Sequence, residues 1–138
     1  MVISEGTVVG AGAFGGASSI EGVVLPETTT AIVDYMFYDC SSLKSFTIPE
    51  SLTSIGRSAF ARCFALQEID IPDTLLSIGD NAFYVCSSLS RVRLPNHLTA
   101  IGNGWFYKCQ SLDDIVIPDG VVTIGDNAFS NSIGLSSV

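Results

Sequence analysis

The sequence predicts a solenoid built from short parallel strands, and three observations support this fold class. The segment 67–89 recurs along the chain with a period of about 23 residues, all five prolines fall in one column of that repeat, and an alternating apolar pair precedes each proline. A fixed period of about 20 to 50 residues is typical of repeat architectures. The chain of 138 residues is therefore expected to form a single elongated domain, 1–138, without a linker.

Six coils are expected to account for the chain. Residues 1–20 form a degenerate copy, in which Ile3 stands at the place of the proline unless one residue is missing nearby. The expected coils, numbered one to six below, are 1–20, 21–43, 44–66, 67–89, 90–112 and 113–135, and 136–138 begin a further strand. Because neither end resembles a polar capping coil, we expect a longer array or a partner that covers the open ends.

Each coil is expected to contain one short strand that ends at its proline. The residues before the proline alternate between apolar and variable positions, as in Ile69 and Ile71 before Pro72, and this pattern indicates a strand with one buried face. Proline cannot donate to a ladder, so each strand stops there. Strands that recur at the same place in every coil should stack as a parallel sheet, because the rest of the coil provides the crossover that parallel pairing requires.

The second half of each coil carries an Ile-Gly pair and then an Ala-Phe-x-x-Cys-x-x-Leu motif. Glycine in the pair indicates a turn at positive φ or a close approach of two backbones. Val33 replaces it in the second coil, which should therefore turn differently. The motif has the spacing of a short helical segment, and Ser58, Asn81 and Asn127 precede it as expected N-caps. Trp105 replaces the alanine and should project at the edge of the core or distort it.

Two columns of the motif should form spines through the core. The phenylalanine column, in which each ring is expected to contribute ~1.5–3 kcal/mol by burial, holds Phe14, Phe37, Phe60, Phe83, Phe106 and Phe129. The cysteine column holds Cys40, Cys63, Cys86 and Cys109. Four cysteines could form two disulfides or a zinc site, but side chains stacked in a line neither face one another nor converge on a point. We therefore expect buried, reduced thiols that act as small hydrophobes.

Composition and charge argue against several functional classes. No apolar run reaches the roughly 18 residues that a membrane-spanning helix needs. Acidic residues outnumber basic ones 14 to 6, which argues against nucleic acid and anionic membranes, because both are bound by clustered Lys and Arg.

Catalytic and metal sites are not expected either. The only histidine, His97, has no identifiable partner for catalysis, and Asp80 and Asp126 supply one carboxylate per coil, which fits the start of a helix better than a calcium site. The sequence therefore predicts no enzyme, no cofactor and no metal.

The candidate binding residues lie on the outward face of the expected sheet. They are Ser45, Thr47, Glu68, Asp70, Arg91, Arg93 and Asp114. Two acids, two arginines and one acid thus lie side by side on adjacent strands, where opposite charges contribute ~0.2–1 kcal/mol per pair. Two interpretations stay open: charges that pair with one another and keep the face soluble, or a surface that binds a polar ligand or a protein.

The repeat Leu-x-x-Ile-x-Ile-Pro-x-x-Leu-x-x-Ile-Gly-x-x-Ala-Phe-x-x-Cys-x-x-Leu resembles the BspA-type leucine-rich repeat over the entire chain. This resemblance implies a right-handed leucine-rich-repeat solenoid, with a short parallel β-sheet on the concave side and short helical or 3-10 segments and turns on the other. It also implies a surface or secreted protein, often one that acts in adhesion, although the chain shows no signal peptide. The family shares no active site, so no functional residue is carried over.

The leading functional prediction is a non-enzymatic module that binds a protein or a glycan, as a segment of a larger surface or adhesion-type protein. The alternative is an architectural scaffold subunit packed within a larger multi-protein assembly. The first predicts a binding surface on an independently soluble array, whereas the second predicts that the isolated chain self-associates. Expected partners are a protein, a glycan or further repeats, with neither nucleic acid nor direct membrane insertion.

Overall fold

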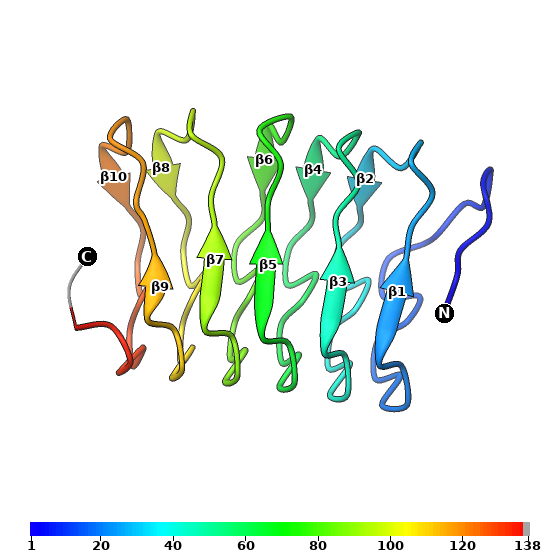
Figure 1. Ribbon diagram of the computed structural model, residues 1–138, viewed down its shortest axis with the longest axis horizontal. Helices are drawn as coiled ribbons and strands as arrows, with labels where there is room; N and C mark the ends of the chain where they lie inside the picture. Colours follow the sequence, from blue (N-terminus) through cyan, green and yellow to red (C-terminus); the bar gives the residue numbers. More distant parts are fainter. Residues whose placement is uncertain (137–138) are drawn as a thin grey trace.

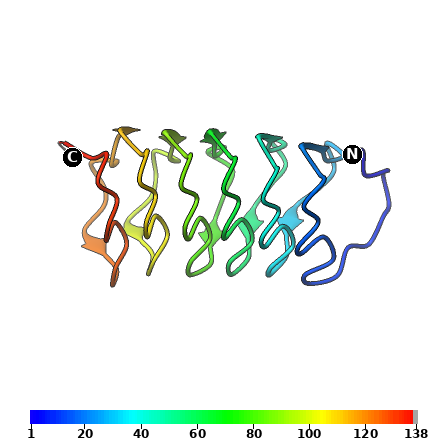
Figure 2. The ribbon, with the colours of Figure 1, turned by 90° about the horizontal axis from the view of Figure 1, so that it is seen from below.

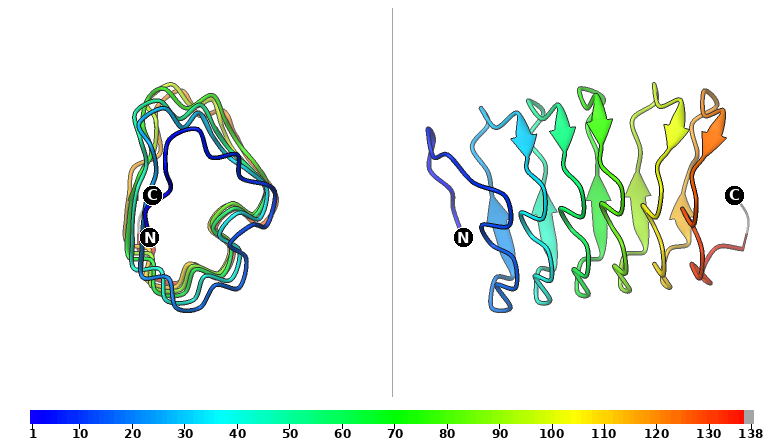
Figure 3. Two further views of the ribbon diagram at one scale, coloured as in Figure 1. Left: turned by 90° about the vertical axis from the view of Figure 1, so that its right-hand side faces the viewer. Right: turned by 180° about the vertical axis from the view of Figure 1, so that it is seen from behind.

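The structure, a computed structural model, describes residues 1–136 as a solenoid whose coils stack side by side (Figure 1). Residues 137 and 138, in the predicted further strand, lie outside this range. The strands are β1 Gly22–Val24, β2 Ala31–Ile32, β3 Ser45–Thr47, β4 Ser54–Ile55, β5 Glu68–Asp70, β6 Ser77–Ile78, β7 Arg91–Arg93, β8 Ala100–Ile101, β9 Asp114–Ile115 and β10 Thr123–Ile124. Seen along the axis, the later coils overlay closely, while the first coil follows a tighter path (Figure 3).

The odd-numbered strands form the parallel sheet that the sequence predicts. Paired residues occupy equivalent positions of adjacent coils, as Ile69 and Val92 do. β1 pairs with β3, and β7 pairs with β5 and β9. β3 lies beside β5, where the amide of Gln67 donates to the carbonyl of Lys44 at 3.4 Å. In β3, β5 and β7 the central residue is buried and both flanking residues are exposed, which confirms the predicted alternation.

The even-numbered strands form a second row, which the sequence analysis missed. Each of these strands is the isoleucine of an Ile-Gly pair, or of Ile32-Val33 in β2, together with the residue before it. β4 pairs in parallel with β2 and β6, and β8 pairs with β10. Figure 2 shows the two rows of strands on different sides of the coils. A two-residue strand is too short to show the alternation by which strands are found in a sequence.

The predicted helical segments are wrong, because no helix occurs among residues 1–136. The motif after the Ile-Gly pair instead folds as a series of tight turns, and the expected N-caps Ser58, Asn81 and Asn127 have φ angles of 50°, 59° and 56°. Backbone groups in this segment bond between coils, as the amide of Phe60 does to the carbonyl of Ala82 at 2.9 Å. Since the neighbouring coil satisfies these amides, the chain needs no helix to do so.

The phenylalanine spine is confirmed. Neighbouring ring centroids in this column lie 5.4–5.7 Å apart and the rings are stacked. The four central rings, Phe37, Phe60, Phe83 and Phe106, are fully buried, whereas Phe14 and Phe129 are partly buried. Each of the four central rings therefore stacks on its equivalents in the two adjacent coils.

The cysteine column is buried and reduced, as predicted. All four cysteines are free thiols. The Sγ of Cys63 donates to the carbonyl of Phe37 at 3.2 Å, and Ser132, in the fifth place of the column, makes the equivalent bond to Phe106. Burial raises the pKa of Cys63 far above its ordinary value and raises the pKa of Cys109 to about 12. At neutral pH these two side chains are therefore protonated thiols.

These thiols should be inert in the native chain and should make its stability fall at alkaline pH. Ellman's reagent should detect few thiols before denaturation and four afterwards; none afterwards, without reductant, would indicate disulfides. The unfolded chain ionises its thiols near the ordinary pKa of 9.0, whereas the folded chain keeps Cys63 and Cys109 protonated. The unfolded state therefore binds fewer protons above pH 9, so stability is unaffected below that pH and falls above it.

A serine variant controls for the other groups that titrate at alkaline pH. Cys63→Ser removes one ionisable thiol, and the bond that Ser132 makes in the same column shows that serine can occupy this position. Urea midpoints at neutral and alkaline pH should decline less for Cys63→Ser than for the original chain. Equal declines would show that Cys63 does not contribute.

The glycines of the Ile-Gly pairs permit close backbone approach, because none of them adopts a positive φ. A β-carbon added to Gly79 would lie 2.5 Å from the amide nitrogen of Arg57 in the preceding coil. Val33 is tolerated at this position because β2 is the edge of its sheet and no strand of the first coil pairs with it. In that first coil Val2 pairs with Val24, where the regular repeat would place Met1, so the coil is one residue shorter than the others.

Trp105 distorts the array, which confirms one of the two expected outcomes. A β-carbon on Gly56, Gly79 or Gly125 would meet the backbone of the preceding coil. On Gly102 it would instead meet the indole ring of Trp105, which is only 4% exposed. No Cα atom of β6 lies within 8 Å of a Cα atom of β8, and Figure 1 shows the interruption between them. The indole thus lies against Gly102, where the other glycines meet the preceding backbone, and the two coils are separated only at β6 and β8.

Candidate functional site

The outward face of the first sheet carries the predicted binding residues. The structure brings all seven together, exposed, on β3, β5, β7 and β9: Ser45, Thr47, Glu68, Asp70, Arg91, Arg93 and Asp114. The strand register places Glu68 opposite Arg91 and Asp70 opposite Arg93. Arg91 in turn lies opposite Asp114 on its other side. We name this set the charged face.

Several charges of this face pair with one another. Nη2 of Arg91 lies 2.9 Å from Oδ1 of Asp70, and Nη1 lies 3.8 Å from Oε2 of Glu68. The hydrogen bond from Arg91 to Asp70, followed by the charges of Asp70 and Glu68, raises the pKa of Arg91 above its ordinary value. Arg93 reaches Asp73, in the turn that follows β5, at 3.7 Å. Exposed pairs of this kind add little stability, so a partner can displace them easily.

Two shallow hollows adjoin Arg93. A hollow of about 310 Å³ lies over β3 and β5 and is lined by Thr47 and Asp70 as well as Arg93. A second, of about 440 Å³, lies over β7 and β9, where Asp114 and the exposed Val116 border it. The charged face therefore combines charged groups with two hollows that a partner's side chains can fill.

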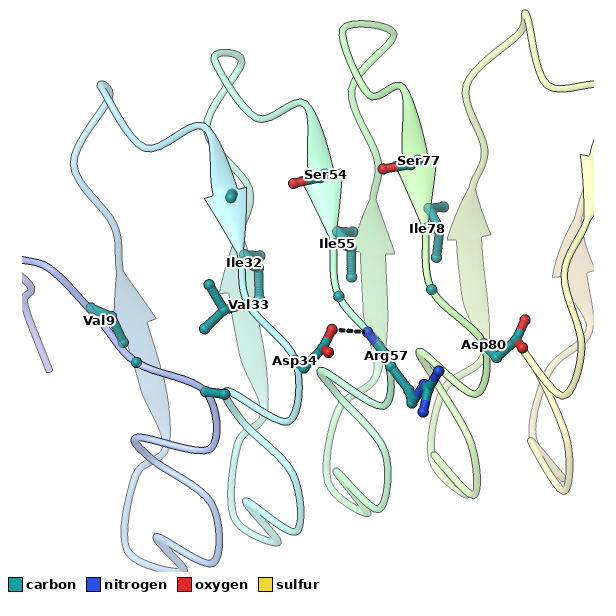
Figure 4. Close-up of a pocket in the computed structure, with 15 residues that line it drawn as sticks. Val9, Ile32, Val33, Asp34, Ser54, Ile55, Arg57, Ser77, Ile78 and Asp80 are labelled. Carbon is teal, nitrogen blue, oxygen red and sulfur yellow. Dashed lines mark hydrogen bonds between the residues drawn. The ribbon is translucent and has the colours of Figure 1, made fainter.

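A groove on the second row of strands was not found by sequence reasoning. It encloses about 830 Å³ and crosses β2, β4 and β6 and the residues that follow them (Figure 4). Small side chains such as Ser54 and Ser77 line it, and Asp34, Arg57 and Asp80 are the charged residues among its lining. The carboxylate of Asp34 accepts a hydrogen bond from the amide of Arg57 at 2.7 Å. The recurring small residue before each Ile-Gly pair was the signal that could have revealed this groove.

Asp80 and Asp126 do not lie at helix starts, because the segments that follow them are turns. Asp80 lines the groove, and Asp126 accepts a hydrogen bond from the amide of Gly104 through its backbone carbonyl at 2.9 Å. His97 is exposed, and its Nε2 lies 2.9 Å from the carbonyl of Asp73. Within residues 1–136 no group of three His, Cys, Asp or Glu side chains is arranged to hold a metal ion. That part of the chain also contains no helix able to span a bilayer.

Two tyrosines stack on the turn side of the coils. The ring centroids of Tyr84 and Tyr107 lie 4.7 Å apart, and the rings are nearly parallel. Both tyrosines line a hollow of about 460 Å³, together with Asn81, Asn103 and Gly104. Sequence reasoning did not single out these tyrosines, although both directly follow a phenylalanine of the spine. The turns thus offer aromatic and amide groups, in contrast to the charged face.

Comparisons with known proteins agree with this architecture. A model of the BspA-type leucine-rich repeat region matches six copies over residues 7–136. A leucine-rich repeat protein of T. pallidum superposes with a TM-score of 0.86 at 26% identity, over 99% of this chain and 77% of that one. A leucine-rich repeat protein from Bacteroides ovatus superposes with a TM-score of 0.71 at 28% identity, over 92% of this chain and 38% of that one. A leucine-rich repeat protein from Eubacterium ventriosum superposes with a TM-score of 0.68 at 24% identity, over 93% of this chain and 41% of that one. A search of curated proteins found no match.

These matches show both the fold and the family. The chain spans most of the T. pallidum protein but less than half of the two others. The repeats of such proteins form a solenoid that generally mediates protein binding, and they are not an enzymatic fold. Since the family model covers nearly all of its residues, the chain belongs to the BspA-type leucine-rich repeat family.

Proposed function

We propose that this chain is a non-enzymatic module that binds a partner protein through the charged face, as part of a larger surface or adhesion-type protein. The observation that carries this proposal is the gathering of seven exposed polar residues from four successive strands on one face. Family membership supports the general role in protein binding. The larger context follows from the family resemblance.

The electrostatics of the charged face favour a partner with complementary charges. Arg91 and Arg93 stand between the acids of β5 and Asp114 of β9. Arginine is enriched at protein interfaces because its planar guanidinium forms directional bonds to carboxylates. We infer that the partner presents an acidic group toward the two arginines and a basic group toward Glu68 or Asp114. Such complementarity sets specificity and the rate of association.

Reversing both arginines should abolish this binding without unfolding the chain. In the double variant Arg91→Glu/Arg93→Glu, every charged residue of the charged face is acidic, and like charges across an interface suppress association. Folding should be preserved, because both side chains are exposed and their ion pairs add little stability. The wild-type chain would first capture its partner from the native source, and calorimetry would then compare the purified partner's affinity for each variant.

A charge-matched variant on the other faces provides the control. Arg57→Glu/Lys108→Glu changes the net charge by the same amount, but Arg57 lines the groove and Lys108 lies beside Tyr107 on the turn side. This variant should bind as the wild type does. If it loses binding while the Arg91/Arg93 variant keeps it, the binding site lies on the groove or the turns.

A further inference from the structure

Among the second to sixth coils, one junction lacks backbone bonds that join the others. From the third coil on, the glycine amide of the Ile-Gly pair usually donates to an isoleucine carbonyl of the preceding coil. These bonds run from Gly56 to Ile32, from Gly79 to Ile55 and from Gly125 to Ile101, at 2.7, 2.8 and 2.8 Å. Across residues 1–136, however, the amides of Thr99 and Gly102 find no backbone partner, and the carbonyls of Leu76 and Ile78 receive no bond from them.

The two strand edges at this junction face each other without pairing. β6 and β8 are more than 8 Å apart, whereas adjacent strands lie about 4.8 Å apart. The core is also less covered here. Ile78 and Leu98 are only partly buried, although their equivalents in the third coil, Ile55 and Leu52, are buried. The edge at β6 therefore presents the free carbonyls of Leu76 and Ile78, and the edge at β8 presents the free amides of the flanking residues Thr99 and Gly102.

The indole of Trp105 adds a third unpaired group to this junction. Its Nε1 is buried and has no hydrogen-bond partner among the described residues. The same nitrogen is the atom that a β-carbon on Gly102 would meet first, so it lies at the edge of β8. A buried donor without an acceptor is unfavourable and is expected to gain from one.

We propose that the split between β6 and β8 accepts one extended segment of a partner protein as an added strand. Unpaired strand edges are templates for another strand, and strand addition is an established mode of peptide recognition. The amides of the segment would bond the carbonyls of Leu76 and Ile78. Its carbonyls would accept from the amides of Thr99 and Gly102 and from Nε1 of Trp105. This site is separate from the charged face.

The surroundings of the split define the sequence that such a segment needs. Alternate side chains would point inward over Ile78 and Leu98, which are apolar and incompletely covered. The others would point outward between Ser77 and Ala100, which are small and exposed. The groove over β2, β4 and β6 ends at β6, next to the split (Figure 4). A segment of alternating apolar and polar residues without proline fits these requirements.

A displayed library of short random peptides tests the proposal on the purified chain. We expect peptides enriched on the wild type to alternate apolar and polar residues. They should slow hydrogen exchange at the amides of Thr99 and Gly102. They should also shift the single indole N–H resonance, which belongs to Trp105, the only tryptophan.

Variants at the split make the test specific. Trp105→Ala restores the alanine found at Ala59 and Ala82, so β6 and β8 should close, Gly102 should become as protected as Gly79, and peptide affinity should fall about tenfold or more. Thr99→Pro removes one free amide and should weaken binding similarly, whereas Thr99→Val keeps the amide and should bind as the wild type does. The proposal is overturned if Gly102 is already protected in the free wild type, or if no enriched peptide depends on both Trp105 and the amide of Thr99.

Discussion

Replacing Phe83 by alanine should lower the free energy of unfolding by about 3–5 kcal/mol. Phe83 is fully buried, and its ring stacks between Phe60 and Phe106 at centroid distances of 5.6 and 5.7 Å. The two neighbouring coils cannot collapse into the space, because backbone bonds such as that from Phe83 to the carbonyl of Trp105 fix the spacing of the coils. Urea denaturation followed by circular dichroism would measure the loss.

Phe64→Ala is the matched control for this prediction. Phe64 is outside the spine and only half-buried, and its ring lies 5.1 Å from the guanidinium carbon of Arg62 at the surface. It should therefore lose much less stability than Phe83→Ala. Equal losses would show that the stacked column is not the main contributor to the core.

Gly79→Ala should destabilise the chain by about 1–3 kcal/mol through crowding. The added methyl group would lie 2.5 Å from the amide nitrogen of Arg57, and backbone atoms can yield only if the two coils separate. Gly10→Ala serves as the control, since a β-carbon there meets no atom within 4 Å. This variant should be neutral or slightly stabilising, because alanine restricts the unfolded chain. Similar losses at both positions would contradict the close-approach role of the Ile-Gly glycines.

The sequence was sufficient to predict the first sheet and the two spines. Each depends on one side-chain type that recurs at the same position of successive coils, such as the phenylalanine at Phe60 and Phe83, and equivalent positions in a solenoid lie next to one another. The seven residues of the charged face could be located for the same reason. Their function could not, because exposed charges look alike whether they bind a partner or one another.

The remaining features depend on contacts between coils that no local pattern encodes. Helical spacing after Ser58 and Asn81 suggested helices, but positive φ at both residues and bonds to the next coil produced turns. The second row of strands consists of pairs such as Ser77–Ile78, which are too short to recognise. The replacement of alanine by Trp105 was visible, yet the resulting separation of β6 from β8 required the structure.

Site-specific photo-cross-linking in an extract of the native source tests most directly whether the charged face is the binding surface. A photoreactive phenylalanine analogue would replace Thr47 on the charged face, Ser54 in the groove or Tyr38 on the turns, in three separate variants. We expect a discrete cross-linked protein for the analogue at Thr47, and the loss of that product when Arg91 and Arg93 are both changed to Glu. Cross-linking from Ser54 or Tyr38 but not from Thr47 would contradict this expectation.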